Sequence, residues 1–148
     1  MPPDAPAPDK LSIVVFSGDF ERVHYALAMA SAAVATNRPA TLFFTMGAIR
    51  ALLADHGDGT PGWHALGPAE GGLGPGERDR EFARRGVATF AELMDACRDL
   101  GVTFMVCEMG LRAMGLTPEE LRGDIAYEEG GIVSFLADVS PAGQMVFI

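Results

Sequence analysis

Short runs of apolar, β-branched and aromatic residues recur along this chain, and stretches with helical spacing separate them. Three such runs occupy residues 11–16, 40–45 and 102–107, and a fourth occupies residues 144–148. A run that is apolar throughout is typical of a strand buried on both faces, as parallel strands are. Strands that alternate with helices predict an α/β fold. We expect a three-layer sandwich in which a mostly parallel, roughly five-stranded sheet has helices on both faces.

Apolar residues between these runs recur at helical spacing. The predicted helices are residues 20–36, 46–55, 90–100 and 132–139. Asp19 stands where the first of them needs an N-cap. Thr117 and Glu120 have the spacing of a capping box, which predicts a further helical turn.

The length of 148 residues predicts one domain, residues 11–148, after a disordered, proline-rich leader over residues 1–10. Within the domain, residues 56–77 contain eight glycines and three prolines and predict an insertion loop. A loop of this length is either a solvated excursion, which we expect here, or a lid that Trp63 could anchor. Residues 80–86 predict a charged turn.

The formal net charge is −9, and Lys10 is the only lysine. Because no basic cluster is present, we expect no nucleic-acid partner. The sequence has neither an apolar run of about 18 residues nor a basic, apolar leader, so we expect no membrane association and no secretion. Two cysteines without a secretion signal favour free thiols in the reducing cytoplasm.

Cys107 ends the third predicted strand, and a helix is predicted to follow it. In parallel α/β sheets, ligands bind at the edge where the strands end, and Ser17, Gly18 and Asp19 belong to the same edge. A helix that begins near Glu108 would direct free N–H groups at the thiol and favour the thiolate, which is the nucleophilic form. The position alone fits a buried packing residue equally well, since free cysteine is among the most buried residue types.

The charges near Cys107 do not decide between these interpretations. Glu108, Glu128 and Glu129 can all lie near the thiol, and their negative charge would oppose a thiolate. Arg112 lies on another side of the predicted helix, where it is expected to pair with Glu108.

Two other residues bear on the chemistry of Cys107. Cys97 lies on the apolar face of its helix, too far from Cys107 for a disulfide, and is predicted to be structural. His24 lies beside the apolar stripe of the first helix, where it is either a buried histidine or a group that transfers protons near the pocket.

Metal and nucleotide sites are not favoured. Met105, Cys107 and Met109 alternate and would suit Cu(I), but a helix that starts at residue 108 breaks the alternation, so packing is the preferred interpretation. His56 and His64 lack the second pair of ligands that a structural zinc site needs. Glycine-rich phosphate-binding motifs are absent from the sequence. We therefore predict neither a metal nor a cofactor.

Residues 96–116 resemble the DsrE/DsrF-like family of sulfur-handling proteins. In that family a strand ends in a cysteine, six residues follow, and a basic or apolar residue with glycine opens the next turn. Here these positions are Cys107 and Met114-Gly115. The other similar segments are residues 17–19, 128–136 and 144–148. The resemblance thus covers roughly residues 10–148, apart from the glycine-rich loop.

The resemblance implies an α/β sandwich that assembles into trimers or hexamers. It also implies that Cys107 carries sulfur as a persulfide between donor and acceptor proteins. The methionines at 105, 109 and 114 look closer to the branch with a Cys-x-Met pattern than to the tRNA-thiolation branch. The residues expected to support the pocket are Ser17, Gly18, Asp19, His24, Glu108, Met109, Gly110, Gly130 and Gly131.

We therefore predict a cytoplasmic sulfur carrier or sulfurtransferase that acts within a homo-oligomer. One alternative is a non-catalytic oligomeric scaffold in which Cys107 only packs, and another is a subunit that binds a small ligand or a soft metal under the glycine-rich loop. A carrier must present Cys107 to another protein, whereas a packing cysteine is sealed. Accessibility of this thiol therefore separates the carrier from the scaffold.

Overall fold

A five-stranded parallel sheet forms the centre of the computed structural model, which describes residues 6–128 and 130–148. The strands are β1 (Leu11–Val15), β2 (Ala40–Phe44), β3 (Thr103–Val106), β4 (Tyr127–Glu128) and β5 (Gln144–Phe147). Their order across the sheet is β4-β3-β2-β1-β5. The predicted α/β class is confirmed, and β4 is the strand that the sequence pattern did not locate.

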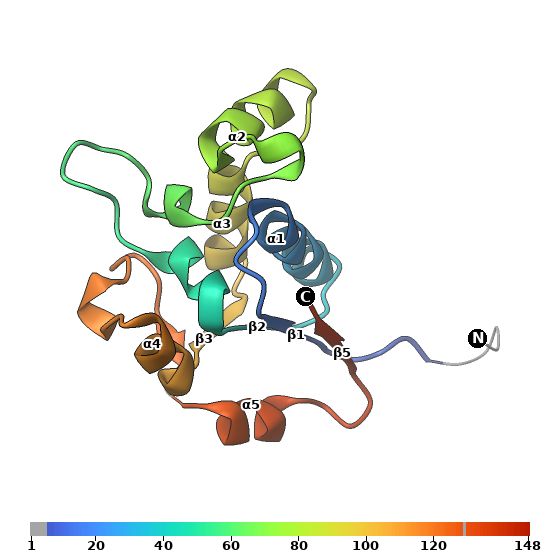
Figure 1. Ribbon diagram of the computed structural model, residues 1–148. Helices are drawn as coiled ribbons and strands as arrows, with labels where there is room; N and C mark the ends of the chain where they lie inside the picture. The colour runs from blue at the N-terminus through green and yellow to red at the C-terminus, as the bar shows by residue number, and fades with distance from the viewer. Residues whose placement is uncertain (1–5, 129) are drawn as a thin grey trace.

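Helices lie on both faces of the sheet, with α1 and α3 on one face and α5 on the other (Figure 1). The α-helices are α1 (Phe20–Ala35), α2 (Pro75–Arg84), α3 (Phe90–Asp99), α4 (Glu108–Met114) and α5 (Ile132–Asp138). The short 3₁₀ helices are η1 (Met46–Leu52), η2 (Gly62–Ala65), η3 (Glu70–Gly72) and η4 (Pro118–Glu120). The three predicted layers are therefore present.

The two faces of the sheet belong to two separate hydrophobic clusters. Successive strand residues point to opposite faces, so Leu42 and Phe44 join the large cluster that includes α1 and α3. Phe43 joins a much smaller cluster, which includes Phe135 of α5 and Cys107. The face that contains Cys107 is thus the thinly covered one.

The element boundaries depart from the prediction in three places. In the structure, each strand that the sequence located ends one residue before its predicted end. Cys107 therefore follows β3 instead of ending it. The helix predicted at residues 46–55 is the 3₁₀ helix η1. The charged turn predicted at residues 80–86 is wrong, because most of it belongs to α2. This helix has few apolar residues, and ion pairs from Glu81 to Arg78 and Arg85 support it instead.

The glycine-rich segment is packed against the large cluster except at its tip. The Trp63 ring stacks on Phe20 and Phe90, with centroid distances of 5.7 and 4.7 Å. Residues 54–59 form the exposed tip. Beyond Trp63, the Gly67 N–H donates a 2.7 Å hydrogen bond to the Gly18 carbonyl. The expectation of a solvated excursion therefore holds for the tip and for the exposed residues 70–72, and the anchored part lies on the face opposite Cys107.

The described part of the predicted leader already contacts the domain. The Lys10 ammonium lies 2.7 Å from the Asp138 carboxylate, and the Ser140 hydroxyl donates to Asp9 at 2.6 Å. Residues 1–5 lie outside the described part of the chain. Among the described residues, no helix is both long and apolar enough to cross a membrane.

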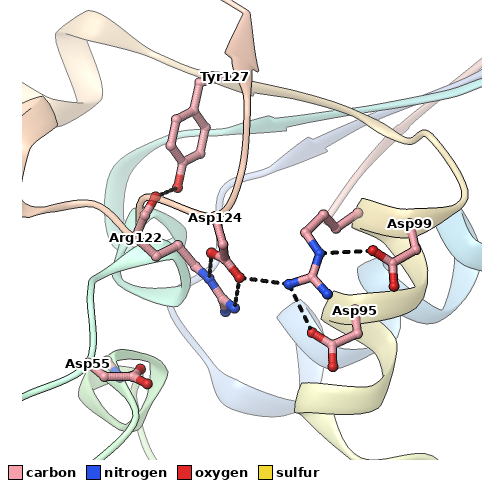
Figure 2. A network of polar contacts seen from close by, with 8 residues as sticks. Asp55, Asp95, Asp99, Arg122, Asp124 and Tyr127 are labelled. Atoms are coloured by element: carbon pink, nitrogen blue, oxygen red, sulfur yellow. Dashed lines mark hydrogen bonds and ion pairs between the residues drawn. The ribbon is translucent and has the colours of Figure 1, made fainter.

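A polar network fixes the segment that leads into β4 (Figure 2). Asp124 accepts hydrogen bonds from Arg122 at 2.7 and 2.8 Å and from Arg98 of α3 at 2.7 Å. The Tyr127 hydroxyl donates to the Arg122 carbonyl at 3.1 Å. Mainly because of the Arg122 hydrogen bonds, the pKa of Asp124 falls from 3.8 to about 2.

Replacing Asp124 by asparagine is expected to reduce the free energy of unfolding by about 1 kcal/mol or less, since the side chain is 42% exposed and solvent screens the pairs. The folded pKa lies below the unfolded value, so the stabilisation is complete above about pH 5 and is lost as the pH falls toward 2. Urea unfolding of wild type and Asp124→Asn from pH 7 to pH 2 measures this. A stability difference that persists at the lowest pH would contradict the assignment.

Candidate functional site

Cys107 stands at the junction of β3 and α4. Its N–H donates to the Phe44 carbonyl of β2 at 2.9 Å, and its own carbonyl accepts from Leu111 of α4 at 3.0 Å. It therefore occupies the N-cap position of α4, at the edge where the parallel strands end. This is the edge at which sheets of this kind bind ligands.

The side chain of Cys107 is buried, with 1% of its surface exposed. It lies in the small cluster with Phe43, Met105 and Phe135. Phe43 and Met105 are register partners on adjacent strands, so the two side chains share a face of the sheet. The thiol is thus enclosed by apolar side chains from β2, β3 and α5.

The α5 helix covers this cluster through few contacts. Phe135 is its only buried residue, and its ring stacks on Phe43 at 4.7 Å between centroids and 16° between planes. At the end of the helix, Asp138 accepts hydrogen bonds from Lys10 at 2.7 Å and Thr41 at 2.8 Å. Burial opposes ionisation of Asp138, but these two hydrogen bonds outweigh it and lower its pKa. One aromatic stack and the hydrogen bonds of Asp138 therefore hold α5 over the Cys107 cluster.

An apolar groove of about 290 Å³ lies along one side of α5. Its lining residues are Val14, Phe16, Phe43, Thr45, Met46, Met109, Ile132, Phe135, Leu136, Met145 and Phe147. Phe43 and Phe135 belong to both the groove and the Cys107 cluster. Several lining side chains are more than half exposed, including Phe147 at 67% and Leu136 at 56%. Large exposed apolar patches of this kind mark interaction sites.

The opposite side of α5 is polar and acidic. A pocket there is lined by Thr103, Met105, Glu128, Ser134 and Asp138. A further hollow beside β4 includes Glu108 and Glu128 in its lining. Among the described residues, the predicted ion pair between Glu108 and Arg112 does not form. Glu129 lies outside the described residues.

Of the predicted pocket residues, Met109 and Gly110 belong to α4, and Gly130 and Gly131 precede α5. Met109 is 53% exposed and lines the apolar groove. Gly110 is buried, and a Cβ there would lie 2.8 Å from the Thr45 hydroxyl, so only glycine allows α4 to pack this closely. A Cβ on Gly130 would lie 3.8 Å from the Met105 methyl, and Gly131 is the N-cap residue of α5.

The predicted pocket residues near β1 lie farther from the thiol. Gly18 packs against Gly47, where a Cβ would lie 3.2 Å from the backbone. Ser17 accepts from the Asp19 N–H at 3.1 Å. Asp19 occupies the N-cap position of α1 as predicted, but its side chain makes no capping hydrogen bond. These three residues share the sheet edge with Cys107 and not its cluster.

His24 is part of the large cluster on the other face. Its Nε2 lies 2.8 Å from the Ala88 carbonyl, and its ring packs on Phe82 at 4.7 Å. It therefore lies away from Cys107 and fits the interpretation as a buried, hydrogen-bonded histidine.

Cys97 is fixed in the core of the domain. It is fully buried, and its thiol donates to the Leu27 carbonyl at 3.3 Å. Burial raises the pKa of this thiol to about 12, so it remains protonated at neutral pH. Both cysteines are free thiols.

Phe43 and Phe135 are the site residues that the sequence analysis missed. Strand alternation could have identified Phe43, because residues 41 and 43 of a strand through residues 40–45 face away from residues 42 and 44. Phe135 had no comparable signal, since its contact with Phe43 depends on how α5 crosses the sheet.

The alternation of Met105, Cys107 and Met109 is broken, as expected, because α4 begins at Glu108. Met105 is buried beside Cys107, whereas Met109 points into the groove region and is half exposed. In the described part of the chain, no three His, Cys, Asp or Glu side chains gather as metal ligands do.

The sequence profile of the DsrE/DsrF-like family matches residues 9–144. The uncharacterized protein YrkE of Bacillus subtilis (strain 168) is 27% identical over 156 aligned residues, covering 94% of this chain and 96% of YrkE. Two solved structures share the fold: MTH1491 of Methanobacterium thermoautotrophicum, a protein of unknown function, and ychN of E. coli. MTH1491 has a TM-score of 0.56 at 12% identity, with 94% of this chain and 98% of that chain covered. For ychN the TM-score is 0.52 at 16% identity, with 93% and 97% covered.

Proposed function

The chain belongs to the DsrE/DsrF-like family, and from that premise we propose that it is a cytoplasmic sulfur carrier that holds sulfane sulfur on Cys107. Membership of the family suggests a role in sulfur relay. The observation that carries the proposal is the position of Cys107 at the ligand-binding edge of the sheet, beside an exposed apolar groove. Cys97, by contrast, is hydrogen-bonded and buried in the large core.

The proposed transfer uses two balanced steps. The Cys107 thiolate attacks the outer sulfur of a donor persulfide, an S–S bond to Cys107 forms, and the donor's own S–S bond breaks. The donor sulfur leaves as a thiolate, so no external oxidant or reductant is required. An acceptor thiolate then attacks the outer sulfur on Cys107, which releases the Cys107 thiolate and completes the relay.

Transfer requires that Cys107 become accessible, since its thiol is enclosed in the resting chain. The weakest part of its enclosure is α5, which is held by the stack of Phe135 on Phe43 and by the two hydrogen bonds that Asp138 accepts. Gly130, with a φ of 143°, and Gly131 precede this helix and give its approach the conformational freedom of glycine. Local opening of such a thinly held element costs less than global unfolding.

Phe135→Ala is expected to speed alkylation of native Cys107 by iodoacetamide about fivefold or more, because the aromatic stack alone contributes about 1 kcal/mol to closure. Val133→Ala is the matched control: Val133 is on the same helix, but it is 83% exposed and lies outside the cluster. Labelling rates followed by mass spectrometry give the comparison. Equal labelling rates for the two variants would mean that α5 does not limit access to Cys107.

A second candidate function is a non-catalytic scaffold subunit, and the enclosure of Cys107 favours it. In that case the cysteine serves only as a packing residue. Incubating the reduced protein with polysulfide and measuring its intact mass separates the candidates. A carrier gains sulfur that dithiothreitol removes, whereas a scaffold with a sealed thiol gains none.

The proposal includes assembly into a homo-trimer or homo-hexamer and exchange with donor and acceptor proteins. Light scattering of the purified chain tests the assembly, with a mass of three or six chains expected. A monomer that still accepts sulfur on Cys107 would remove the oligomer from the proposal and leave the carrier function in place.

A further inference from the structure

We propose that the sulfur partner of this chain presents its cysteine on a short segment with apolar residues next to the cysteine and a basic residue beyond them. This segment would dock along α5. The inference rests on the proposed carrier function of Cys107 and specifies the chemistry of the partner. It predicts that small anionic donors are poorer substrates than such a segment.

The groove is lined by apolar side chains. Among the described residues, its lining contains no charged side chain and a single polar one, that of Thr45. An anionic donor would lose its hydration there without gaining a hydrogen-bond donor or a cation in return. Apolar side chains would instead gain free energy by covering Phe147, Leu136 and their neighbours.

Phe43 and Phe135 form the wall shared by the groove and the Cys107 cluster. A side chain seated in the groove would touch Phe135 directly, where it could take the place of the stack with Phe43. Binding at the groove and uncovering of Cys107 are therefore linked through Phe135.

The other side of α5 carries negative charge. Glu128 and Asp138 line the pocket there, and Lys10 is the cation that already pairs with Asp138. A lysine or arginine of the partner would complement this pocket while the apolar residues occupy the groove. The same carboxylates would repel an acidic partner segment.

A short segment of a separate protein fits the groove better than a second copy of this chain. A copy bound permanently over α5 would hold Cys107 closed against every donor, whereas a carrier needs an occupant that leaves. The groove volume of about 290 Å³ also has room for a few side chains only.

The test uses two synthetic peptides of equal length, each carrying one cysteine persulfide. One peptide has leucine on both sides of the cysteine and a lysine beyond, and the other has glutamate at these three positions. Transfer to wild type, Leu136→Glu and Leu100→Glu is followed by intact mass. Leu100 is the matched control, because it is 54% exposed and lies outside the groove. Polysulfide loading of all three proteins reports the carrier function independently of docking.

The apolar, basic peptide is expected to load wild type about tenfold faster than the acidic peptide, which is no more than the burial of one leucine side chain can supply. Leu136→Glu should abolish this preference, and Leu100→Glu should retain it. Equal rates for both peptides in wild type would overturn the inference while polysulfide loading upheld the carrier. Dissociation of an oligomer by Leu136→Glu alone would also overturn it, since the groove would then join copies of this chain. A wild type that polysulfide does not load refutes the carrier function, and the inference falls with it.

Discussion

Cys107→Ser is expected to abolish sulfur loading from polysulfide completely. A serine hydroxyl is not nucleophilic at neutral pH without an adjacent base. The only other thiol, Cys97, stays protonated because burial raises its pKa to about 12. Intact mass before and after dithiothreitol measures the loss. The effect is all or none, because Cys97 is buried and protonated and the sequence contains no third cysteine.

Cys97→Ser is the matched control and is expected to load like wild type. Both substitutions bury a hydroxyl, which costs about 1–3 kcal/mol where no partner is available, so circular dichroism should confirm that each variant is folded. Cys107→Ala, which buries no polar group, keeps the test valid if Cys107→Ser unfolds. Loading that survives in Cys107→Ala and disappears in Cys97→Ser would contradict the assignment of the sulfur-bearing residue.

Gly62→Ala is expected to cost about 3 kcal/mol or more of unfolding free energy. A Cβ at this position would lie 2.0 Å from the Leu53 carbonyl oxygen and 2.6 Å from that of Ala54. Backbone atoms cannot yield as a flexible side chain can, so the clash must move the segment that holds Trp63. The expected result is an earlier urea midpoint and red-shifted fluorescence from Trp63, the only tryptophan of the chain.

Gly57→Ala provides the control for this prediction. It lies in the exposed tip of the same segment, and a Cβ there has no heavy atom within 4 Å. Its stability is expected to stay within about 0.5 kcal/mol of wild type, as for most surface substitutions. Equal stability of the two variants would mean that residues 62–66 are not packed as the structure describes.

The fold could be predicted because most of its strands are recognisable as apolar runs in the sequence. Residues 11–16, 40–45 and 102–107 are continuous apolar runs, and such runs are strands only if both faces are buried. β4 could not be found in this way, because it is two residues long. α2 was missed because it contains few apolar residues and ion pairs support it.

The candidate site could be predicted only in part. The position of Cys107 at a strand end could be predicted, because strand ends are local features of the sequence. Met109 and the glycines at 130 and 131 could be placed beside helix starts for the same reason. The enclosure of the thiol depends on α5 crossing the sheet over Phe43, and no local pattern encodes such a long-range contact. His24 shows the same limit, since helical spacing placed it near the apolar stripe but could not say which face of the sheet that stripe covers.

The most direct test of the account is to locate the added sulfur in the wild-type protein. After polysulfide treatment, the persulfide is blocked by alkylation under native conditions, and the chain is digested and sequenced by tandem mass spectrometry. The account predicts one additional sulfur on the peptide that contains Cys107 and none on the peptide that contains Cys97. Sulfur on Cys97, or on neither cysteine, would contradict the proposal that Cys107 carries sulfur.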